Sequence, residues 1–170
     1  PCPELRVCDV TEKACQLRTM RAVVCMRGGD PDGKLPKVQV LTEKQYLARI
    51  AAYAQEDPES AALYDRFLRG LSLFGLSPAS YTHEDAQESQ AARILAAYFF
   101  IEKDVVILDR GQSMSSADAV ATFAHEVVHA LQDRELDLLE YQARWARDFD
   151  GSLAIDALIE GEATLYDLRV

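Results

Sequence analysis

The residues of this 170-residue chain best suited to chemistry form the run His125-Glu126-Val127-Val128-His129. An α-helix places positions four apart on one face, so the imidazoles of His125 and His129 can converge on one ion. Glu126 lies about 100° further round the helix, where its carboxylate can reach a water on that ion. The spacing therefore predicts a metal site on a helix, with His125 and His129 as ligands.

The chemistry expected of this run is hydrolysis of a peptide bond. Neutral imidazoles bind Zn²⁺ at about 2.0–2.1 Å, and an open position on the metal holds a water whose pKa falls toward ~7. Glu126 can accept the proton of that water as it attacks a carbonyl and then pass it to the leaving amine. We therefore expect one zinc ion per chain, with Glu126 as the catalytic residue.

A third protein ligand is expected, because catalytic zinc sites usually have three. The longer motif with a third histidine is excluded, since Gln132 and Glu135 stand where its glycine and last histidine would be. A last helix, predicted over residues 151–168, offers Glu160 and Glu162. These two lie about 200° apart around a helix, so both cannot reach one ion.

The motif and its downstream glutamate resemble the gluzincin group of zinc metallopeptidases. Thirty residues separate His129 from Glu160, which directly precedes Gly161 in Ile159-Glu160-Gly161-Glu162-Ala163. In the aminopeptidase branch a glutamate before a glycine is the third ligand, so the resemblance implies Glu160 rather than Glu162.

This resemblance covers residues 96–168 and implies a zincin-like domain that acts on a peptide or protein substrate. The stretch 124–133 is also similar to little-characterised bacterial exported proteins of predicted metallopeptidase type. By the same analogy, the strand before the active-site helix would pair with an extended substrate, with Tyr98 as a candidate contact.

The expected fold class is α+β, mostly helical, with a small antiparallel sheet before the active-site helix. Residues 94–109 predict a hairpin. Apolar residues at helical spacing predict the active-site helix from Ala117 to about Asp133, with Ser115 and Asp118 as its capping residues. Alternation predicts a strand at 38–41, and periodicity predicts helices from Thr42 to about Gln55 and from about Pro58 to Phe74.

The last helix is predicted to turn an apolar stripe toward its neighbour. The stripe consists of Ala154, Leu158, Gly161, Leu165 and Leu168. Because glycine has no side chain, Gly161 is expected to allow close approach of the two helices.

All four cysteines, Cys2, Cys8, Cys15 and Cys25, lie in the first 25 residues. No C-x-x-C pair is present, which argues against a zinc knuckle and favours two disulfides, in any of three pairings. Disulfides persist in oxidising compartments. We therefore expect an exported protein, periplasmic or secreted.

Length and composition indicate a single domain over residues 1–170, with a cysteine-rich N-terminal segment at 1–26. A net charge of −10 disfavours nucleic acid as a partner, and no apolar run is long enough to span a bilayer. The third histidine, His83, lies in a polar stretch and is expected at the surface. Nothing in the pattern indicates an oligomeric state.

A second hypothesis is a zincin-fold protein that binds zinc but has little or no activity and acts as a binding or regulatory module. Related enzymes often place a Tyr or His downstream of the third ligand to stabilise the oxyanion. This sequence stops ten residues after Glu160, which favours the second hypothesis.

Overall fold

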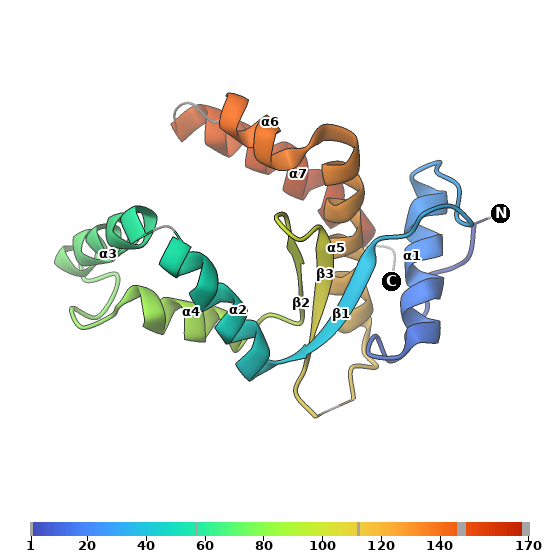
Figure 1. The fold of residues 1–170 in the computed structure, drawn as a ribbon, viewed down its shortest axis with the longest axis horizontal. Coiled ribbons are helices and arrows are strands. Elements are labelled where there is room, and N and C mark those ends of the chain that lie inside the picture. The colour runs from blue at the N-terminus through green and yellow to red at the C-terminus, as the bar shows by residue number, and fades with distance from the viewer. Residues whose placement is uncertain (1, 57, 112, 146–148, 168–170) are drawn as a thin grey trace. The chain divides into compact units, whose positions relative to one another are not determined.

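The computed structural model describes residues 2–56, 58–111, 113–145 and 149–167 (Figure 1). The chain divides into two compact units, residues 1–40 with 95–170 and residues 41–94. Helices predominate and the strands form one small sheet, so the predicted α+β class is confirmed. No helix among the described residues is long and apolar enough to cross a membrane.

The first unit carries the predicted active-site helix. Its helices are α1 (Lys13–Met26), α5 (Ala117–Leu136), α6 (Leu138–Trp145) and α7 (Phe149–Asp167), and its strands are β1 (Lys37–Thr42), β2 (Ala96–Phe99) and β3 (Asp104–Asp109). β2 and β3 form the expected antiparallel hairpin, with Tyr98 opposite Val105. The sheet has the order β1-β3-β2 and is mixed rather than wholly antiparallel. Because β2 and β3 are antiparallel, β1 is the strand that runs parallel to β3.

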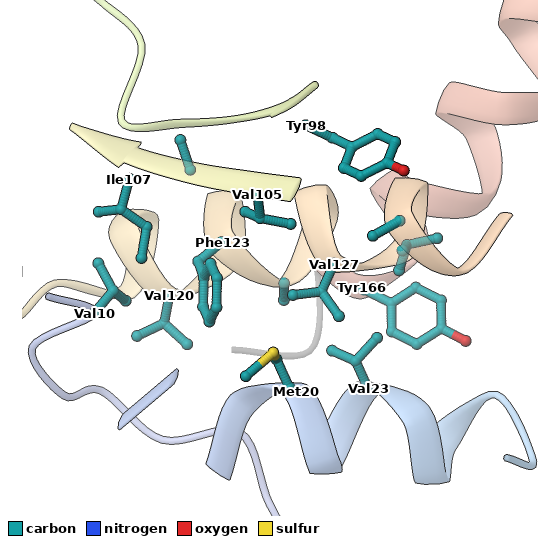
Figure 2. Packing of buried hydrophobic residues seen from close by; sticks show 14 of the residues in the cluster. Val10, Met20, Val23, Tyr98, Val105, Ile107, Val120, Phe123, Val127 and Tyr166 are labelled. Carbon is teal, nitrogen blue, oxygen red and sulfur yellow. The ribbon is translucent and has the colours of Figure 1, made fainter. Parts of the chain in front are cut away.

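The core of this unit is built around α5. Phe123 and Val127 are fully buried and lie between β3 on one side and α1 on the other, where Met20 and Val23 face them (Figure 2). Removing this much apolar surface from water is the main force that holds the three elements together. The helix that carries His125 and His129 is therefore a rigid support.

Two disulfides, Cys2–Cys25 and Cys8–Cys15, staple the N-terminal segment, as the sequence predicts. Helix α1, in contrast, is not expected from the sequence. Its signal is weak, because Glu12 gives the first turn no side-chain cap and polar residues such as Gln16 and Thr19 stand among its buried positions.

The start of α5 differs by one residue from the prediction. Ser116, not Ser115, is the N-cap, and its hydroxyl accepts a hydrogen bond from the Ala119 backbone N–H at 3.1 Å. Both serines are suitable N-cap residues, but only Ser115 has an acidic residue, Asp118, three positions later, and that pattern favoured the wrong serine. The helix then continues to Leu136, three residues beyond the predicted end.

The predicted packing face of α7 is wrong. Leu158 and Leu165 are exposed, and no atom lies within 4 Å of the position a Cβ would take at Gly161. Leu168 lies outside the described residues. The face that α7 buries instead consists of Ile155, Ile159, Ala163 and Tyr166. Two isoleucines, one turn apart, begin this buried face, whereas the leucine stripe faces solvent.

The second unit contains α2 (Glu43–Glu56), α3 (Pro58–Leu73) and α4 (His83–Ala91). The first two are the helices expected from periodicity. Thr42 caps α2 through a reciprocal pair of hydrogen bonds: the Thr42 N–H donates to the Gln45 side chain, and the Gln45 N–H donates to the Thr42 hydroxyl. Gly75, at φ +71°, follows the end of α3. α4 is not expected from its polar sequence, and the side chain of His83 lies outside the described residues.

Candidate metal centre

Helices α5 and α7 bring the three predicted metal ligands together. The Nε2 atom of His125 lies 3.1 Å from Oε2 of Glu160, and the Nε2 atom of His129 lies 3.5 Å from Oε1 of the same carboxylate. One ligand atom from each of the three residues lies within 4.8 Å of the other two. Glu160 thus meets His125 and His129, which lie 35 and 31 residues earlier in the sequence.

These distances suit a small tetrahedral cation. Two ligand atoms at about 2.1 Å from Zn²⁺ in tetrahedral geometry are about 3.4 Å apart. The two nitrogen-to-oxygen distances, 3.1 and 3.5 Å to the two different oxygens of Glu160, are close to that value. The imidazoles stand nearly perpendicular, with centroids 4.6 Å apart and planes at 79°. Two imidazoles and one carboxylate are also a donor set that zinc accepts.

His129 is buried in a way that favours its neutral form. Burial lowers its pKa, and this outweighs the opposing effects of its hydrogen bond with Gln132 and of the charge on Glu160. The pKa of His129 therefore lies below its ordinary value. A neutral imidazole is the form that binds a metal.

Glu162, the other carboxylate considered for the site, points elsewhere. Its Oε1 accepts from Nε of Arg27 at 2.8 Å, and its Oε2 accepts from the side-chain amide of Gln132 at 2.8 Å. Burial raises its pKa, but the hydrogen bonds from Arg27 and Gln132 more than offset this, so the pKa is lowered. The geometry assigns Glu160 to the histidines and Glu162 to the arginine.

Glu126 lies beside the hairpin. Its Oε2 accepts a hydrogen bond from the backbone N–H of Tyr98 at 2.7 Å. β2 is an edge strand in the part of the chain that the structure describes. In an antiparallel pair, hydrogen-bonded and non-hydrogen-bonded positions alternate along each strand. Leu95 and Leu108 form a hydrogen-bonded pair, so Tyr98, three residues further along, occupies a non-hydrogen-bonded position. Its N–H and C=O therefore point away from β3. Glu126 therefore meets the outer edge of the sheet.

The ring of Tyr98 has a structural role of its own. Its hydroxyl donates to the buried carboxylate of Asp133 at 2.7 Å, and it packs edge-on against Phe100. Burial raises the pKa of the Tyr98 hydroxyl well above its ordinary value, with further contributions from the hydrogen bond and the charge of Asp133. The residue thus reaches Glu126 by its backbone alone.

Three polar residues around the site, Arg27, Gln132 and Asp133, are not among those that sequence reasoning identifies. Gln132 shares the helix face of the histidines, three residues after His129, so helical spacing was a usable signal. Arg27 is 135 residues from Glu162, and no local pattern could reveal that contact.

Comparison with known proteins gives one family match. Residues 76–137 match the family model of the eCIS core domain, where eCIS denotes an extracellular contractile injection system. The matched segment contains α5 with His125, Glu126 and His129, and it ends before Glu160. No curated protein and no solved structure matches the chain. The gluzincin resemblance thus stays a hypothesis drawn from the residues.

Proposed function

We propose that this protein is a zinc-dependent hydrolase of peptide bonds. The observation that carries the proposal is the meeting of His125, His129 and Glu160 beside Glu126 at the outer edge of a β-strand. The three ligand residues would hold one zinc ion, and Glu126 lies next to His125 on α5, the helix that also carries His129. This is the minimum set that the reaction requires.

Each residue has a defined part in this proposal. Bound Zn²⁺ would supply Lewis acidity and lower the pKa of a coordinated water. Glu126 would take the proton of the attacking water and deliver it to the leaving nitrogen. The N–H of Tyr98 orients the Glu126 carboxylate toward the strand edge, where the peptide would lie.

The proposed substrate is an extended peptide segment. The N–H of Tyr98 is bonded to Glu126, but its C=O is also directed outward from β2, so an incoming strand would add to this edge by donating a main-chain hydrogen bond to that carbonyl. A peptide bound in this way passes beside Glu126 and the imidazoles. Main-chain recognition of this kind favours unfolded or extended polypeptides over folded domains.

A second candidate is a zinc-binding module that performs no hydrolysis. The match to the eCIS core domain favours it, because that description names an assembly rather than an enzyme. In this case His125, His129 and Glu160 would hold zinc as a structural ion, and the chain would serve as a component of an extracellular injection system or as a binding partner of one.

Both candidates share a proposed location outside the cytoplasm. Two disulfides are compatible with an oxidising compartment, and the family description is compatible with an extracellular system. We therefore propose that the protein is exported, to the periplasm or beyond.

The deciding experiment compares the wild-type protein with Glu126→Gln. The glutamine keeps an oxygen that can accept from the Tyr98 N–H, so the fold and the zinc content are expected to persist. Turnover of a denatured protein or a peptide library is expected to fall about 10²–10⁴-fold. Equal turnover by the two proteins would remove Glu126 from the mechanism. Zinc binding without turnover by wild type would favour the module.

A further inference from the structure

Gln132 makes three hydrogen bonds inside the protein, and they fix which way its amide points. Its nitrogen donates to the Ile159 carbonyl at 3.0 Å and to the Glu162 carboxylate at 2.8 Å. Both partners are acceptors only, so the NH₂ group must face them. The amide oxygen therefore faces Nδ1 of His129, at 2.9 Å.

This orientation determines the tautomer of His129. An amide oxygen cannot donate, so Nδ1 of His129 must carry the proton of the neutral ring. The lone pair is then left on Nε2, the atom that faces the Glu160 carboxylate at 3.5 Å. The ring is thus set in the form that a cation at this point requires.

Glu162 is itself held by Arg27. The guanidinium donates from Nε at 2.8 Å and from Nη2 at 3.2 Å to the two carboxylate oxygens, a two-point contact that fixes direction as well as distance. The Arg27 side chain is only 13% exposed. A second carboxylate, Glu135, accepts from the solvent side of the same guanidinium at 2.9 Å.

Arg27 is anchored by its own segment. It directly follows α1, and Gly28, at φ +80°, turns the chain while its N–H bonds the carbonyl of Cys25 at 2.9 Å. Cys25 is joined to Cys2 by a disulfide. The N-terminal segment thus has a defined attachment to the site, through Arg27.

We propose that Arg27, acting through Glu162 and Gln132, is a remote positioning residue that sets the tautomer of His129. The value of this tautomer for a metal rests on the proposed function, but the tautomer exists without a metal. Without the Gln132 oxygen, the Glu160 carboxylate is left as an acceptor for the ring, on the Nε2 side. We call the chain of contacts from Arg27 through Glu162 and Gln132 to His129 the relay. Its loss should therefore move the proton of the His129 ring from Nδ1 to Nε2.

The test reads the tautomer directly in metal-free protein. Long-range ¹H–¹⁵N spectra of the histidine rings, recorded after chelation at a mildly alkaline pH where imidazoles are neutral, distinguish Nδ1–H from Nε2–H. Wild type and the control Glu135→Gln are expected to show His129 with Nδ1–H. Gln132→Met is expected to show Nε2–H, and Arg27→Met a mixture of the two forms.

Zinc affinity, measured by competition with a chromophoric chelator, gives a second readout. We expect a loss of about 10–100-fold for Gln132→Met, a smaller loss for Arg27→Met, and no change for Glu135→Gln. Circular dichroism identifies any variant that fails to fold. If a variant does not fold, the test rests on the tautomer of His129 in the metal-free wild-type protein. A proton on Nε2 in that spectrum would overturn the relay.

The two proposals fail in different ways. Wild type with Nδ1–H but no affinity for zinc would reject the proposed metal site and leave the relay intact. Unchanged Nδ1–H in a folded Gln132→Met protein would reject the relay and leave the metal site intact.

Discussion

Glu160 and Glu162 lie two residues apart on α7, and their carboxylates have different partners. Glu160 contacts the Nε2 atoms of His125 and His129, whereas Glu162 contacts Arg27 and Gln132. One helix therefore supplies both a candidate ligand and the support of another ligand. Removing the one carboxylate or the other should therefore affect zinc binding to different extents.

Replacement of Glu160 by alanine is expected to weaken zinc binding more than replacement of Glu162. Glu160→Ala removes one of three ligand groups, so the loss should exceed the about 10–100-fold expected when a supporting partner is removed. Asp156→Ala, which deletes an exposed carboxylate one turn earlier, is the matched control and should bind as wild type. Metal analysis after dialysis measures this, and loss of zinc in Glu162→Ala alone would reverse the assignment.

Gly161→Ala is expected to stabilise the protein. The Cβ would meet no atom within 4 Å, and glycine inside a helix costs about 0.5–1 kcal/mol relative to alanine. The midpoint of urea unfolding should therefore rise. A lower midpoint would show that Gly161 makes a close contact after all, as its position in the sequence suggests.

Ser116→Ala is expected to destabilise the protein by about 1 kcal/mol, because α5 loses the hydroxyl that accepts from Ala119 N–H. Ser115→Ala changes the adjacent residue, whose hydroxyl is an exposed partner of Ser113, and should have little effect. Paired urea titrations compare the two variants. Equal losses would contradict the assignment of the cap.

The metal-free protein is expected to lose stability as the pH falls below about 6.5. Burial lowers the pKa of folded His129 below its ordinary value of 6.5, so the unfolded chain binds the proton more readily. The contribution of neutral His129 to the free energy of unfolding is therefore complete above pH 6.5. It is lost as the pH falls from 6.5 through the lower pKa of the folded state. His129→Gln should show a flatter dependence of unfolding free energy on pH, and an unchanged slope would exclude His129 as the cause.

Local patterns predicted the parts of the fold that depend on short-range regularity. The hairpin and α5 follow from alternation and from helical spacing. The buried face of α7 did not follow, because Leu158 and Leu165 form a regular stripe that faces solvent. A helix with apolar residues on two sides leaves the choice of face to its neighbours.

The candidate site divides in the same way. His125, Glu126 and His129 share one helix, so their juxtaposition is a local property. Glu160 was identified through a family resemblance, and the contact of Arg27 with Glu162 joins elements at opposite ends of the sequence. Such contacts are set by tertiary packing, which one sequence does not record.

The position of Glu160 on a different helix from the two histidines has a consequence for cooperativity. A cation held by the three side chains would close a loop of about 35 residues that contains all of α6, so binding energy would become folding energy for this part of the chain. If α7 detached, Glu160 would leave the cation and Glu162 would release Gln132 in the same event. Ion occupancy and the docking of α7 would then rise and fall together.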